Sequence, residues 1–133
     1  YLKGTSDKIL LHFHANGEDI SQTVPLMNRL NFAFKFTIIG VEYPGYGIYP
    51  ETPTSPKTAA QIILDAETVF KFITDTLHVN KNKIIVSGRS IGSGPACHLA
   101  ANFDPRCLML TSPIKSVNNI ARKICGRITD LVI

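Results

Sequence analysis

The chain has 133 residues, of which 44% are hydrophobic and 18% charged, a composition typical of one globular domain and not of a disordered segment. Its formal net charge of +4 comes from scattered lysines and arginines, with no basic run interleaved with aromatic residues, which argues against nucleic-acid binding. Three cysteines without a CxxC pair indicate free thiols in a reducing compartment, and no apolar run reaches transmembrane length.

The chain begins with a predicted strand, a polar loop and a helix. Lys8–Phe13 is an apolar run, which predicts a strand that is buried on both faces. The small and polar residues of His14–Asp19 form the loop that follows. Asp19 or Ser21 can cap a helix that runs to about Leu30.

A second strand and the most periodic helix of the sequence come next. Phe36–Val41 is a β-branched strand, and Glu42–Gly47 is a turn-rich loop. Ser55 and Pro56 resemble an N-cap and a first helical residue, before a helix over about Thr58–Leu77. One face of this helix is apolar: Ile62, Ile63, Ala66, Val69, Phe70, Ile73 and Leu77.

The third strand leads into the motif around which we interpret the chain. Lys83–Ser87 is a short apolar strand, and Gly92–Asn102 reads as a helix rich in small residues. Between them, Gly88-x-Ser90-x-Gly92 has the pattern of a nucleophile elbow, a tight turn that presents a serine between a strand and a helix. The helix that follows would direct its free N–H groups toward an oxyanion formed at Ser90.

Other functions of these glycines fit less well. The motif alone could be an ordinary strand-to-helix turn, but strand, turn and helix come in the order that the elbow requires. The Walker phosphate loop needs Gly-Lys-Ser/Thr, which is absent. The dinucleotide pattern needs a third glycine three residues after Gly94, where Cys97 stands.

The elements alternate between strand and helix to the end of the chain. Arg106–Thr111 is a fourth strand, ended by Ser112 and Pro113, and Val117–Ile128 is a last predicted helix. This order, with nearly continuous apolar strands, predicts an α/β fold in which helices cover both faces of a parallel sheet. Ligands of such sheets bind at the carboxyl ends of the strands.

Several segments together resemble one family, the α/β-hydrolases, and within it the α/β-hydrolase domain-containing 17 and Bem46-like serine hydrolases. The resemblance rests on four segments in register: His14–Asp19, Glu42–Gly47, Gly88–Pro95 and Leu110–Pro113. It covers almost the whole chain and matches the third to sixth strands of that fold. The resemblance implies a single partial domain over residues 1–133, with strands in the spatial order 4-3-5-6 in the family's numbering.

The resemblance also implies a chemistry. Ser90 matches the nucleophile of an acyl-transfer serine hydrolase that acts on esters or thioesters, such as thioesters of protein-bound palmitate or lipid esters. The backbone N–H groups of Asn16 and Ile91 match the oxyanion hole, and no metal or organic cofactor is implied. The family usually has glycine after the loop histidine, where this chain has Ala15.

The base and the acid that such a serine needs are not evident in the chain. In the family the order is Ser, Asp, His. After Ser90 the chain offers Asp104, Asp130 and His98, and His98 should point away from the serine because it lies about two turns into the following helix. We therefore expect that the chain by itself has no appreciable turnover. Two alternatives remain open, an inactive binding module of the same fold and a serine peptidase-like member.

Other side chains have a functional and a structural interpretation. His12 and His14 could bind a metal, but packing in the sheet and shaping of the loop are favoured. Tyr43 and Tyr46 line an acyl pocket or pack the loop. Arg89 attracts an anionic head group or is a solvated turn residue. Glu42 could be mistaken for the acid, but it precedes the serine.

Both ends of the sequence suggest a piece of a longer protein. The first residue is Tyr1 instead of methionine, and the apolar tail stops at Ile133. The expected location is the cytoplasm, with peripheral attachment to membranes left open. A palmitoylated protein is the expected partner, and nucleic acid is not.

Overall fold

The computed structural model describes residues 1–114 and shows a four-stranded parallel sheet. The strands are β1 (Ile9–Phe13), β2 (Thr37–Val41), β3 (Ile84–Arg89) and β4 (Cys107–Thr111). Their spatial order is β2-β1-β3-β4. This is the order 4-3-5-6 that the resemblance predicted, so the predicted α/β architecture is confirmed.

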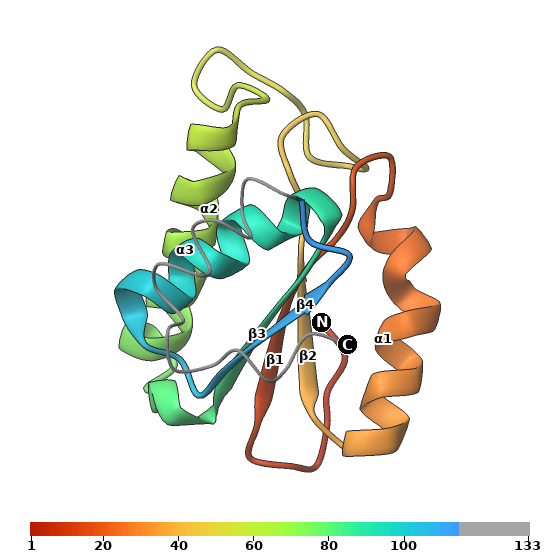
Figure 1. Ribbon diagram of the computed structural model, residues 1–133, viewed down its shortest axis with the longest axis vertical. Coiled ribbons are helices and arrows are strands. Elements are labelled where there is room, and N and C mark those ends of the chain that lie inside the picture. Colours follow the sequence, from red (N-terminus) through yellow and green to blue (C-terminus); the bar gives the residue numbers. More distant parts are fainter. Residues whose placement is uncertain (115–133) are drawn as a thin grey trace.

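Helices cover both faces of the sheet, as Figure 1 shows. Helix α1 (Ile20–Phe34) packs on one face, where Met27 joins a buried cluster with strand residues Leu10 and Ile38. Helices α2 (Ala59–Lys71) and α3 (Ser93–Phe103) pack on the opposite face. The larger core lies there and includes the following buried residues: Leu11, Phe13, Ala66, Phe70, Val86 and Leu99.

Helix α1 begins as predicted and ends later than predicted. The Asp19 carboxylate caps its first turn by accepting the Gln22 N–H at 3.1 Å. The helix continues past Leu30 to Phe34, where Lys35 takes a left-handed conformation and donates its N–H to Asn31.

The start of helix α2 corrects one prediction. Thr58 is the N-cap, because its hydroxyl accepts the Gln61 N–H at 3.2 Å. Ser55 is not a cap; it exchanges two backbone hydrogen bonds with Thr52 within the preceding loop. The predicted helix finishes with a π-helical turn, η1 (Phe72–Thr76), and the side chain of Leu77 is 52% exposed instead of buried on the apolar face.

The remaining boundaries differ from the predicted ones by one or two residues. A 3₁₀ turn, η2 (Lys81–Lys83), precedes β3, and a second, η3 (Ser90–Gly92), separates β3 from α3. The predicted helix over Val117–Ile128, like Asp130, lies outside the described residues. No helix within residues 1–114 is long and apolar enough to cross a membrane.

Candidate active site

Ser90 lies at the sharp turn between β3 and α3, as the motif predicted. Its φ of 52° is in the left-handed region, which costs a non-glycine residue about 1–2 kcal/mol. The serine is half-buried and comes directly after the last residue of a central strand. This strained backbone presents the Ser90 side chain at the carboxyl ends of the strands.

The two glycines of the motif are required by close backbone contact. A Cβ at Gly88 would lie 2.3 Å from the Gly92 carbonyl oxygen. A Cβ at Gly92 would lie 2.3 Å from the Phe13 oxygen and 2.7 Å from the His14 oxygen. A larger residue at position 88 would therefore push β3 away from the start of the following helix, and one at position 92 would push the turn away from the end of β1.

The strand register brings the four predicted loops to one edge. Phe13 lies opposite Val41 in β2 and Gly88 in β3, and Arg89 lies opposite Thr111 in β4. The segments that follow these residues all leave the sheet at the end drawn uppermost in Figure 1. This edge is where ligands of parallel sheets bind.

The first loop forms a tight turn between Ala15 and Glu18. The Glu18 N–H donates to the Ala15 carbonyl at 3.2 Å, and Gly17 has a φ of 77°. Ala15 is not among the described residues with a positive φ, so an alanine after the loop histidine fits without backbone strain. The Asn16 side chain is exposed and accepts the Tyr46 hydroxyl at 2.5 Å.

Ile91 is the second residue of η3, in the first turn after the strand. The N–H groups of a first turn have no intrahelical acceptor and can donate to an oxyanion. The oxyanion roles of Asn16 and Ile91 stay predictions.

The buried His14 and the half-buried Glu42 form a pair that joins two of the loops. The fully buried His14 ring contacts the Ala15 carbonyl through Nδ1 at 3.0 Å and Glu42 Oε1 through Nε2 at 2.7 Å. A carbonyl oxygen can only accept, so Nδ1 donates and one further proton lies between Nε2 and the carboxyl group. Glu42 also accepts the Ile20 N–H at 3.0 Å, which ties it to the start of α1. These contacts give Glu42 a structural role.

The two candidate tyrosines have different surroundings. Tyr43 is buried, stacks on His14 with ring centroids 4.2 Å apart, and donates its hydroxyl to the His14 carbonyl at 2.8 Å. Burial raises the pKa of Tyr43 far above its ordinary value, so the hydroxyl stays protonated. Tyr46 is half-buried and has Lys57 over its ring at 4.2 Å. These contacts favour loop packing for Tyr43, while pocket lining stays a prediction for both.

His12 and Ser87 form a buried pair that their local sequences do not indicate. They lie opposite each other on β1 and β3, with His12 Nδ1 2.6 Å from Ser87 Oγ. Nε2 of His12 is buried without a hydrogen-bond partner, and burial lowers the pKa of His12 to about 4. No group of metal-ligating side chains occurs among residues 1–114, and the partners of His12 and His14 favour packing over a metal pair.

No histidine of the chain is hydrogen-bonded to Ser90. All four histidines lie within the described residues. His98 Nε2 contacts Glu67 Oε1 at 2.7 Å, which joins α3 to α2, and Asp104 pairs with Lys81 at 2.9 Å. These two groups are therefore engaged elsewhere, as expected for His98 from its position in α3; Asp104 is the residue that ends this helix.

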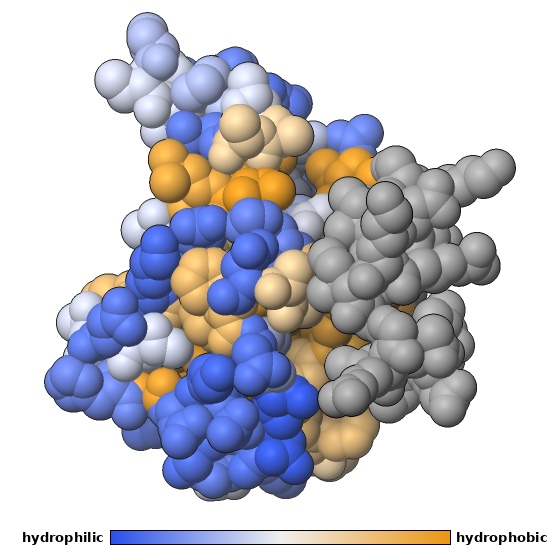
Figure 2. Space-filling view, turned by 60° about the vertical axis from the view of Figure 1, so that its left-hand side comes forward, coloured by the Kyte–Doolittle hydropathy of each residue, from blue (hydrophilic) through white to orange (hydrophobic). Residues whose placement is uncertain are grey.

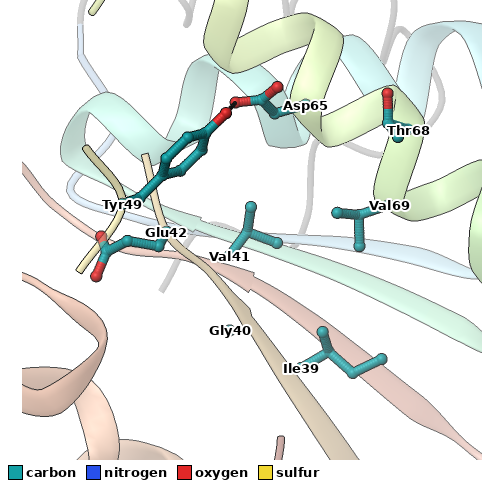
Figure 3. A pocket seen from close by; sticks show the side chains of 8 residues that line it. All are labelled: Ile39, Gly40, Val41, Glu42, Tyr49, Asp65, Thr68 and Val69. Carbon is teal, nitrogen blue, oxygen red and sulfur yellow. Dashed lines mark hydrogen bonds between the residues drawn. The ribbon is translucent and has the colours of Figure 1, made fainter. Parts of the chain in front are cut away.

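A pocket of about 350 Å³ lies between β2 and α2 and does not include Ser90. Figure 3 shows apolar side chains from both elements facing it, among them Ile39, Val41 and Val69. At its rim, the Tyr49 hydroxyl donates to Asp65 at 3.2 Å. The pocket lies along β2, which is an edge strand of the sheet formed by residues 1–114.

Comparison with models of known protein families gives no match. Curated proteins do match. The chain is 31% identical over 112 residues to the α/β hydrolase domain-containing protein aho-3 of Caenorhabditis elegans, which covers 84% of this chain and 32% of that protein. It is 28% identical to human α/β hydrolase domain-containing protein 17B, over 84% of this chain and 38% of the relative. It is 27% identical to protein bem46 of Schizosaccharomyces pombe, over 84% and 36%.

Solved structures share the fold. The esterase Pf2001 of Pyrococcus furiosus superposes with a TM-score of 0.66 at 19% identity, over 84% of this chain and 44% of that one. The Francisella virulence factor BioJ gives 0.62 at 23% identity, over 84% and 38%. The chain spans about a third of the length of the curated relatives that it matches. Together with the Ser90 turn and the strand order, these matches identify the chain as one with the α/β-hydrolase fold, similar in sequence to the Bem46 and α/β-hydrolase domain-containing 17 proteins.

Proposed function

We propose that the full-length protein hydrolyses acyl esters or thioesters, with Ser90 as the nucleophile. The observation that carries the proposal is the left-handed backbone of Ser90 at the turn between β3 and α3. A non-glycine residue keeps such a conformation only where the surrounding structure enforces it, and such strain is concentrated at functional sites. The hydrolase relatives and the esterase of the same fold support the reaction class.

The reaction would proceed through an acyl-enzyme. The Ser90 hydroxyl oxygen attacks the acyl carbonyl, its proton passes to a base, and the N–H groups of Ile91 and Asn16 stabilise the oxyanion. Collapse of this intermediate leaves the acyl group on Ser90, and the alcohol or thiol departs with the proton. Water then attacks the acyl-enzyme and releases the acid. The base would come from the rest of the full-length protein, because no histidine of this chain is hydrogen-bonded to Ser90.

The surface near the carboxyl ends of the strands supports an apolar substrate. On the face seen in Figure 2, hydrophobic residues form a patch just below the hydrophilic top, and smaller apolar areas lie farther down among mainly hydrophilic residues. In the turn after Gly47, Ile48 is 98% exposed, and Leu64 of α2 is 55% exposed. A long acyl chain, such as palmitate on a protein, would add apolar contacts there. This substrate class would suit a cytoplasmic protein that meets membranes peripherally.

A non-catalytic binding module is the second candidate. It is favoured by the placement of His98, which contacts Glu67 on α2 instead of facing the serine. A fold that kept the turn but lost the base would still present the same edge to a ligand.

Assays on the full-length protein separate these candidates. Short- and long-chain p-nitrophenyl esters and a palmitoyl thioester would be compared in wild type, Ser90→Ala and Ser112→Ala. Ser112 is a matched control, because it is an exposed serine at the same edge with a φ of 47°. We expect turnover that Ser90→Ala lowers by about 10⁴-fold or more and Ser112→Ala leaves unchanged. Turnover that survives Ser90→Ala would rule out the proposed nucleophile.

A further inference from the structure

The carboxylate of Glu18 bridges two parts of the candidate site. One oxygen, Oε2, accepts the backbone N–H of Ala15 at 3.1 Å, within the first loop. The other, Oε1, pairs with the guanidinium of Arg89, the residue directly before Ser90. Glu18 thus links Arg89, the residue before Ser90, to Ala15, the residue before the predicted oxyanion donor Asn16.

We propose that Glu18 is a positioning residue that, through Arg89, fixes the first loop relative to Ser90. The contacts of Glu18 with Ala15 and Arg89 would set the distance between the Ser90 hydroxyl and the Asn16 N–H. This inference rests on the proposed function, in which these two groups act on the same substrate carbonyl. A donor displaced by about 1 Å loses much of its effect on the reaction, so this separation controls the rate.

At the tip of the first loop, the Asn16 side chain accepts a hydrogen bond from the Tyr46 hydroxyl at 2.5 Å, but the backbone has little other support. Asn16 and Gly17 are exposed, and a Cβ built on Gly17 would meet nothing within 4 Å. The backbone of the tip is therefore positioned mainly by the contacts at the beginning and the end of the loop. His14 fixes the beginning, through Glu42 and through the Tyr43 hydroxyl on its carbonyl. Glu18 fixes the end, and its carboxylate reaches the nucleophile turn.

The bridge is better suited to local positioning than to overall stability. The Glu18 side chain is 22% exposed and the Arg89 side chain 48%. Ion pairs with this exposure contribute little to the free energy of unfolding. Removing the bridge should therefore loosen the loop while leaving the unfolding temperature almost unchanged. The same pairing explains Arg89 without an anionic substrate group.

Hydrogen exchange on the full-length protein tests the positioning directly. The amides of Ala15 and Glu18 would be followed by NMR in wild type, Glu18→Gln, Arg89→Met and Arg89→Lys, with Leu10 and Val86 as core references. Lys81→Met is the control, because it removes an exposed ion pair, with Asp104, next to the start of β3 and away from the Ser90 turn. We expect exchange at Ala15 and Glu18 to accelerate by about tenfold in Glu18→Gln and Arg89→Met. Arg89→Lys should restore part of the protection, because it keeps the charge, and Lys81→Met should change nothing.

The rate of labelling by a fluorophosphonate probe gives the functional readout. In the same variants we expect labelling of Ser90 to slow by about tenfold, with the unfolding temperature unchanged. Unchanged exchange at Ala15 and Glu18 in both bridge-breaking variants would overturn the proposal, whatever the labelling shows. If exchange accelerates in the variants but the probe does not label Ser90 in the wild type, the positioning role of Glu18 is supported and the proposed function is contradicted.

Discussion

At the scale of single residues, the backbone of Ser90 stores strain that a substitution can release. Its φ of 52° disfavours every side chain with a Cβ, and glycine is free of this cost. We expect Ser90→Gly to be more stable than Ser90→Ala by about 1 kcal/mol, because both lack the hydroxyl and differ only in the Cβ. Chemical denaturation of the two variants measures the difference. Equal stability, or a more stable alanine variant, would show that the turn is not strained.

The buried His12 makes stability depend on pH. Burial lowers its pKa from 6.5 to about 4 in the folded chain, so the unfolded chain binds the proton first as the pH falls. Stability should therefore decline between pH 6.5 and pH 4, by up to about 3 kcal/mol from this group. Below pH 4 both states are protonated, and this decline ends.

The non-titrating variant His12→Gln isolates this effect from other titrations. Urea unfolding of both proteins across the pH range should show that their stability difference changes in favour of the variant as the pH falls. A constant difference would mean that His12 titrates alike in both states.

At the scale of elements, the turn between β3 and α3 depends on close approach to the end of β1. A Cβ at position 92 would lie 2.3 Å from the Phe13 oxygen, and nothing lies within 4 Å of a Cβ built at position 94. We expect Gly92→Ala to destabilise the chain by at least about 2 kcal/mol, through overpacking against backbone that cannot move aside. Gly94→Ala should instead stabilise it by up to about 1 kcal/mol, because Gly94 lies within α3. Thermal unfolding compares the two, and equal effects would contradict the packing that we describe.

Local patterns predicted the elements better than they predicted the contacts between them. The Ser90 turn followed from glycines two residues away on either side, and the α2 face followed from its helical period. Glu18 and Arg89, however, are 71 positions apart, and nothing in their local sequences indicates that they meet. The His12–Ser87 pair could be inferred only from the register between β1 and β3. Ser55 followed by Pro56 has the local pattern of a helix cap, but Thr58 caps α2.

In the molecule as a whole, the two edge strands of the sheet, β2 and β4, differ in what they pair with. At the β2 edge, Leu2 and Ile38 exchange two backbone hydrogen bonds of 2.8 Å, and the pocket beside α2 lies along the same strand. At the other edge, β4 pairs with no further strand of residues 1–114, and Met109 is 38% exposed. Apolar strand edges of this kind favour association with other chains.

We therefore expect residues 1–133, expressed alone, to self-associate. Sedimentation velocity over a concentration series should show larger species as the concentration rises, and the full-length protein serves as the control. The same preparation should not hydrolyse p-nitrophenyl esters above the rate in buffer. A monomer at every concentration, with turnover that depends on Ser90, would contradict both expectations.

Mapping the adduct of an active-site probe identifies the nucleophile. The full-length protein would be treated with a fluorophosphonate probe, digested, and analysed by mass spectrometry. We predict one adduct on the peptide that carries Ser90, absent from Ser90→Ala and retained in Ser112→Ala. Ser87 and Ser93 lie in the same stretch but are buried and hydrogen-bonded, to His12 and to the Ser90 carbonyl respectively. An adduct on either of them, or no adduct at all, would contradict the assignment of Ser90 as the nucleophile.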